Sequence, residues 1–134
     1  MPTAEQIHAA NEATDTALPF AAYLATRLND IADGLRRGDD APALSSLGES
    51  TSELNDFMTY LSLVSEFVAE VPDLESQVGN YIKSLSEQLQ SLEEPLANLD
   101  LVEVADTLEL DLVRNLEAYP SLHQSLTAHL STVN

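Results

Sequence analysis

Several residue types are missing or scarce in this chain of 134 residues, and each scarcity excludes a class of structure. There is no cysteine, which excludes a disulfide framework, a thiolate metal site and a cysteine nucleophile. Four glycines and six prolines are too few for the many turns of an all-β domain. No apolar run approaches the length that a membrane-spanning helix needs. A helical protein outside the membrane is the expected class.

Basic residues are the scarcest charged type, with five Lys and Arg against 23 Asp and Glu. The formal net charge of −18 repels nucleic acids and anionic lipid surfaces, so we expect neither as a partner. The acidity has two explanations. The simpler one, which we favour, is solubility in a saline environment, and the other is a basic partner protein.

Leucine is the main apolar residue, with 23 copies in a chain that is 44% hydrophobic. Side chains that are unbranched at Cβ lose little freedom on a helix, so this composition favours packed helices. The length fits one domain with a real core. We therefore expect a single helical-bundle domain over residues 1–134, with residues 1–14 as a loose helix or a frayed tail. No secretory signal is expected in the sequence, and we expect a cytoplasmic location.

Apolar spacing predicts the helices, and Gly, Pro and Asp residues mark their ends. We expect Gly38 to stop the first helix, Gly48 to bend or split the second stretch, and Asp73 and Asp100 to cap later helices. Short connections favour antiparallel neighbours, hence an all-α up-down bundle of about four main helices with a short C-terminal helix. The expected helices cover residues 17–37, 42–71, with 53–71 the most apolar part, 73–92, 100–119 and 122–130.

The segment from Phe57 to Val71 is apolar on most sides of a helix. Such a helix lies at the centre of a bundle or forms half of an oligomer interface. Either location would explain the pattern, and this apolar surface is the reason to expect an interaction partner. The candidate interface residues are Phe57, Met58, Tyr60, Leu61, Val64, Phe67 and Val68.

Asp106 and Glu109 lie three residues apart on a partly apolar row of the expected fourth helix. Shielded carboxylates require a cation, a capping N–H group or a metal. Arg36, Arg37 and Arg114 are the available cations, and we favour an ion pair or a solvated face over a metal site. As metal ligands, Asp106 and Glu109 are weak candidates, because a di-metal bundle also needs Glu-x-x-His pairs.

The histidines and the known catalytic motifs give no sign of an enzyme. His123 and His129 are six residues apart and point to different sides, and we expect His8 to lack a carboxylate partner. There is no phosphate-binding loop, dinucleotide fingerprint or nucleophile elbow. We therefore expect no catalytic residue, no cofactor and no enzymatic activity.

Two segments carry a resemblance: Gly34–Asp40, with the sequence GLRRGDD, and Ala105–Asp111, with the sequence ADTLELD. They resemble a pattern in small uncharacterised all-helical bacterial proteins. The resemblance implies a bundle and no activity. It draws attention to the acidic residues in the matching stretches, which are Asp39, Asp40, Asp106 and Glu109.

The leading interpretation is a non-enzymatic interaction or adaptor protein, which binds another protein or forms a homodimer. One alternative is an export chaperone of the secretion or flagellar type, which would hold an amphipathic client helix in an apolar groove. The other is a carboxylate metal-binding bundle built on Asp106 and Glu109.

Overall fold

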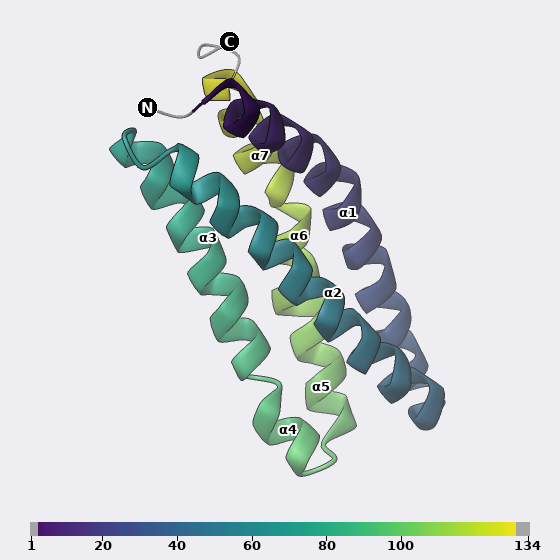
Figure 1. The fold of residues 1–134 in the computed structure, drawn as a ribbon. Coiled ribbons are helices and arrows are strands. Elements are labelled where there is room, and N and C mark those ends of the chain that lie inside the picture. The colour runs from purple at the N-terminus through teal and green to yellow at the C-terminus, as the bar shows by residue number, and fades with distance from the viewer. Residues whose placement is uncertain (1–2, 131–134) are drawn as a thin grey trace.

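The computed structural model describes residues 3–130, and every regular element in that range is helical (Figure 1). The elements are α1 (Ala4–Arg36), α2 (Asp40–Phe67), α3 (Pro72–Gln90), α4 (Glu93–Ala97), α5 (Leu101–Thr107), the π-helical segment η1 (Leu108–Val113), α6 (Arg114–Glu117) and α7 (Tyr119–Leu130).

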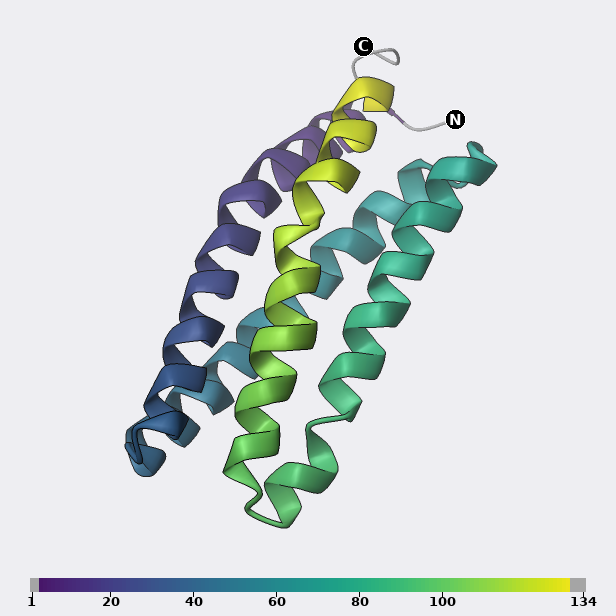
Figure 2. The ribbon, with the colours of Figure 1, turned by 180° about the vertical axis from the view of Figure 1, so that it is seen from behind.

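Four long rods form an up-down bundle, which confirms the expected all-α class. The fourth rod is composite: α5, η1, α6 and α7 follow one another almost in line and contact α1 (Figure 2). The start of α1, the α2–α3 turn and the end of α7 lie at the same end of the bundle. Within residues 3–130, no helix combines the length and the apolar character needed to cross a membrane.

The first helix begins at Ala4 and not near residue 17, so a frayed tail is not what the structure shows for residues 4–14. Thr3 caps it: its hydroxyl accepts from the Gln6 N–H at 3.1 Å, and the Gln6 side chain accepts from the Thr3 N–H at 2.8 Å. This is a capping box, which satisfies two backbone donors at the helix start. Ala10 and Thr14 are buried, so this part of α1 belongs to the bundle.

The first helix ends as predicted. Gly38 has φ +87°. Glycine adopts this conformation at little cost because it has no Cβ. The Asp39 N–H donates to the Gly34 carbonyl at 2.9 Å and the Gly38 N–H to the Leu35 carbonyl at 3.3 Å. These two bonds are those of a Schellman motif, which satisfies the last carbonyls of the helix.

Three other predicted boundaries have different outcomes. Gly48 does not split α2, because Leu47 and Ser50 on either side are buried in the bundle and their packing outweighs the cost of about 1 kcal/mol for one helical glycine. Asp73 lies inside the first turn of α3, which is capped at Val71. Asp100 does cap α5, since its carboxylate accepts from the backbone N–H three residues later at 3.2 Å.

An aromatic cluster lies at the centre of a leucine-rich core. The rings of Phe57 and Tyr119 meet edge to face at 5.2 Å, and Tyr81 lies 5.8 Å from Tyr119. The Tyr81 hydroxyl donates to the Asn115 carbonyl at 2.8 Å, which joins α3 to α6. This cluster ties α2, α3 and the fourth rod together, and large leucines from all four rods surround it. The fully buried leucines include Leu24, Leu28, Leu54, Leu61, Leu85, Leu108, Leu112, Leu116 and Leu126.

Tyr119 in the core and the half-buried Tyr81 beside it predict a loss of stability at alkaline pH. Burial raises the pKa of Tyr119 from 10.0 to about 12, and burial, followed by the nearby Tyr119, raises the pKa of Tyr81. The unfolded chain therefore ionises these phenols first, so their stabilising contribution is complete below pH 10 and is lost as pH rises toward 12. The free energy of unfolding, measured with urea below pH 10 and near pH 12, checks the prediction. Between these two pH values the Tyr81→Phe variant should lose less stability than the wild type. An unchanged free energy of unfolding across the interval would contradict it.

Candidate functional site

Arg36, in the last turn of α1, joins the two carboxylates that the sequence marked as metal candidates. Its guanidinium bonds to Asp106 at 3.0 Å and to Glu109 on η1. The Glu109 carboxylate, then Asp106, raises the pKa of Arg36. The ion-pair interpretation is confirmed, with Arg36 as the partner rather than Arg37 or Arg114. No group of three or more His, Asp or Glu side chains within residues 3–130 could hold a metal ion.

The histidines differ in part from expectation. His8 does have a carboxylate partner, because its Nε2 lies 3.1 Å from Glu12 at i,i+4 spacing on the exposed face of α1. His123 lies 6.0 Å from the Tyr119 ring, and its Nδ1 is buried without a hydrogen-bond partner. Neither arrangement brings together the groups of a catalytic site.

Most of the seven interface candidates lie in the core of the single chain. Phe57, Leu61 and Val64 are buried because they form the stripe of α2 that faces the other helices, and Val68, which follows the end of α2, is buried as well. These four side chains offer no surface to a partner while the bundle is folded. Among the other three, Met58 and Phe67 are half-buried and Tyr60 is 36% exposed.

Tyr60 belongs to a cluster that we call the aromatic patch: Phe20, Tyr23, Tyr60 and Leu63. The Phe20 ring stacks on Tyr23 at 6.0 Å and meets Tyr60 edge-on at 6.4 Å. Tyr23 is 44% exposed. Leu63, which lies one turn after Tyr60 on α2, is 39% exposed. Phe20 and Tyr23 were not among the interface candidates expected from the sequence. Their i,i+3 spacing on one helix was a visible signal, but their meeting with Tyr60 depends on how α1 packs on α2.

Charged groups at the edge of the aromatic patch are tied to one another. Arg27 of α1 lies 2.6 Å from Glu49 and 3.5 Å from Glu53, and its Nε donates to the buried Ser50 hydroxyl at 3.0 Å. The Tyr23 hydroxyl bonds to Glu53, which raises the pKa of Tyr23. This network joins α1 to α2 beside the patch and holds the Tyr23 hydroxyl.

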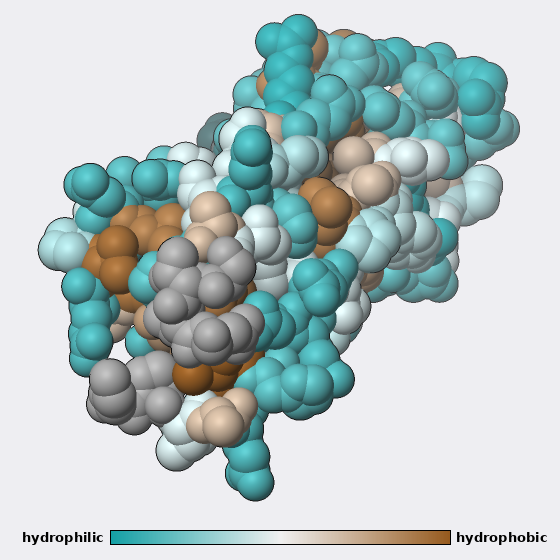
Figure 3. Space-filling model, turned by 90° about the horizontal axis from the view of Figure 1, so that it is seen from above, coloured by the Kyte–Doolittle hydropathy of each residue, from teal (hydrophilic) through white to brown (hydrophobic). Residues whose placement is uncertain are grey.

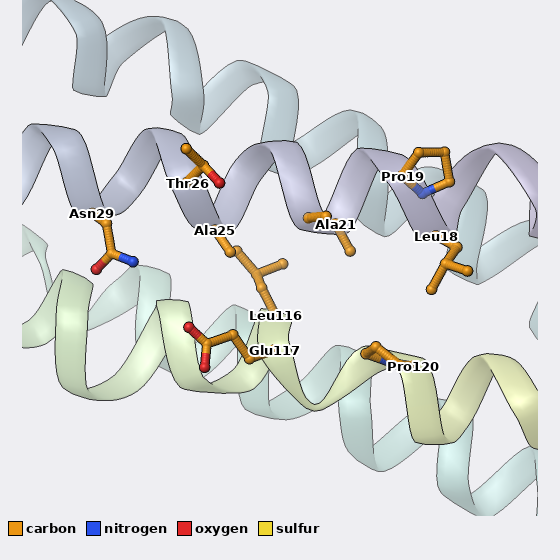
Figure 4. A pocket seen from close by; sticks show the side chains of 10 residues that line it. Leu18, Pro19, Ala21, Ala25, Thr26, Asn29, Leu116, Glu117 and Pro120 are labelled. Atoms are coloured by element: carbon orange, nitrogen blue, oxygen red, sulfur yellow. The ribbon is translucent and has the colours of Figure 1, made fainter.

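A groove of about 500 Å³ lies on the other side of α1, between that helix and the α6–α7 junction (Figure 4). We call it the α1–α6 groove. Short side chains explain it, because Ala21, Ala22 and Ala25 leave space that larger residues would fill. The other lining residues are Leu18, Pro19, Thr26, Asn29, Leu116, Glu117 and Pro120.

A smaller groove of about 310 Å³ lies between α2 and the end of α3 with α4. Its apolar residues include Met58, Leu89 and Leu96, and its other lining residues are mainly polar. Apolar surface also gathers at one end of the bundle. Figure 3 shows brown surface around the end where α1 starts and α7 finishes, and mostly hydrophilic surface toward the opposite end.

Residues 12–121 match the family described as Domain of unknown function (DUF8042). The matched range contains both the aromatic patch and the α1–α6 groove. Searches among curated proteins and among solved structures found no match. Because the family match covers most of the chain, this protein belongs to the family of the Domain of unknown function (DUF8042).

Proposed function

We propose that this chain is a non-enzymatic interaction protein of the adaptor type, which binds a partner protein through the aromatic patch. The observation that carries the proposal is the meeting of Phe20, Tyr23 and Tyr60 at the surface, with the exposed Leu63 beside them. The cytoplasmic location expected from the sequence is part of this proposal.

The chemistry of the patch supports binding to protein. Tyrosine provides a large apolar face with a polar tip and has few rotatable bonds, so ordering it on binding costs little. Aromatic residues are enriched at the centres of protein interfaces and supply a large share of their binding energy. Arg27 and its acidic partners form a polar edge next to these rings, and an apolar centre with a polar rim is the usual anatomy of an interface.

The net charge of −18 bears on which partner is favoured. Two copies of this chain repel each other, so a homodimer through the patch has to overcome that repulsion, whereas a neutral or basic partner protein does not. We therefore propose another protein as the main partner. The metal-binding alternative loses support, because the guanidinium of Arg36 already occupies the space between Asp106 and Glu109 and pairs with both carboxylates.

The substitution Leu63→Gln is expected to weaken binding of the partner protein while leaving the fold intact. Leu63 is already 39% exposed, so the change costs little stability, but it places a polar amide beside the aromatic rings of the patch. We expect affinity for the partner captured by the tagged wild-type protein to fall by on the order of tenfold or more.

The matched control is Leu110→Gln, which changes a leucine of 45% exposure outside the patch and should retain the partner. Purified partner and variants can be compared by isothermal titration calorimetry, with sedimentation equilibrium to detect self-association. Equal affinities of the Leu63→Gln and Leu110→Gln variants would refute the proposed role of the patch. If the wild-type protein forms a dimer and the Leu63→Gln variant does not, the partner at the patch is a second copy of this chain and not another protein.

A further inference from the structure

We infer that the α1–α6 groove is a second docking site, which takes a basic amphipathic helix of a partner protein. The groove lies on the opposite side of α1 from the aromatic patch, so the inference goes beyond the proposed function and does not depend on the patch. Three features of the groove support a helical, basic occupant: its shape, the distribution of polar groups along it and the charge around it.

The shape of the groove suits a helix. It runs along α1 from Leu18 to Asn29, a distance of about 16 Å, or three helical turns. Its volume lies in the range of ligand sites that bury several apolar side chains. The two walls are helices with no sheet edge, so an extended peptide would find no backbone partners there. A helix satisfies its own backbone and offers a row of side chains to such a groove.

The groove is apolar at one end and polar at the other. Figure 4 shows Leu18, Pro19 and Pro120 together at the first end, with Asn29 and Glu117 toward the second. A helix that binds here would place apolar side chains against the proline end. One or two turns further on, it would present a donor to the Glu117 carboxylate.

The charge around the groove selects a basic occupant. Glu117 is exposed and forms no ion pair with any residue in 3–130. Asp15 and Asp33 lie two and three helical turns from Ala22, so they share its face of α1 just beyond the two ends of the groove, and both are exposed. A lysine or arginine of the occupant would meet Glu117 in the groove, and basic residues near its two ends would meet Asp15 and Asp33.

The backbone adds an acceptor at the apolar end. Pro19 lies inside α1 and has no N–H group, so it cannot donate to the Asp15 carbonyl one turn earlier. That carbonyl is left to accept from solvent or from an incoming donor, and a lysine at the end of the bound helix supplies one. A second copy of this chain is a poor occupant, because its net charge is also −18.

The probe for this site is a fluorescent synthetic peptide of about five helical turns, with leucines on one face and lysines on the other. A second peptide carries glutamate in place of every lysine. Fluorescence anisotropy should show saturable binding of the basic peptide to the wild-type protein and none of the acidic one. Ala22→Gln, which fills the groove, and Glu117→Lys, which reverses its charge, should each weaken binding by about tenfold.

Matched variants separate the groove from general attraction to an acidic protein. Ala9→Gln changes an exposed alanine elsewhere on α1, and Glu70→Lys makes the same charge change in the α2–α3 turn. Both should bind the basic peptide as the wild type does. The Leu63→Gln variant should do so as well, so a failure of the aromatic patch and a failure of the groove give different results.

Methyl resonances of labelled alanines locate the peptide, with thermal unfolding by circular dichroism as the check that each variant is folded. Signals of Ala21, Ala22 and Ala25 should shift on titration, while that of Ala9 should not. The inference is overturned if the basic peptide does not bind, if Glu70→Lys weakens binding as much as Glu117→Lys, or if the shifts lie away from the groove.

Discussion

Phe57→Ala is expected to lower the free energy of unfolding by about 3–5 kcal/mol. The Phe57 ring is fully buried and meets three others edge to face, those of Tyr119 at 5.2 Å, Phe20 at 6.2 Å and Tyr81 at 6.5 Å. Removing it leaves a cavity among side chains from three of the four rods. Because a domain of this size is stable by only about 5–15 kcal/mol, much of its stability would be lost.

The control for this variant is Tyr60→Ala, one turn away on the same helix. Tyr60 is 36% exposed and contacts only the edge of the cluster, so we expect a loss of about 1 kcal/mol. Urea unfolding followed by circular dichroism measures both. If Phe57→Ala instead left the unfolding free energy unchanged and dissociated an oligomer, Phe57 would be an interface residue and its assignment to the core would be wrong.

Gly34→Leu is expected to lower the free energy of unfolding by about 1–3 kcal/mol. Gly34 is buried where α1 and α2 approach before their connecting turn, and a Cβ there would lie 3.3 Å from the Cβ of Ala43. An alanine could be accommodated by a small shift, but a leucine would force the two helices apart. The change would also strain the Schellman bond that the Gly34 carbonyl accepts from Asp39.

Gly48→Leu is the matched control, because it makes the same substitution in a helix where a Cβ would meet no atom within 4 Å. Here leucine should stabilise by up to about 1 kcal/mol, since it favours the helix more than glycine does. Chemical denaturation of the two variants side by side tests the close approach of α1 and α2. Equal effects of the two substitutions would show that the contact at Gly34 has no energetic importance.

Features that depend on neighbouring residues could be predicted from the sequence. The apolar spacing of leucines gave the helices, Gly38 marked the end of the first, and Asp100 the start of α5. The capping box at Thr3 and Gln6 was equally visible as a local pattern, and the late predicted start of α1 came from overlooking it. The i,i+3 pair Asp106 and Glu109 was likewise recognisable as a place that needs a cation.

The sequence by itself determined an acidic, all-α bundle, because net charge is a sum over residues and helix periodicity is local. Only the tertiary structure decided which arginine pairs with Asp106 and Glu109, since Arg36 is some 70 residues away along the chain. Only the packing of the helices separated core from surface around Phe57 and Tyr60, where most sides of the helix are apolar. The α1–α6 groove likewise exists because short side chains of α1 meet the α6–α7 junction, and periodicity along one helix cannot show which residues of another helix will lie opposite.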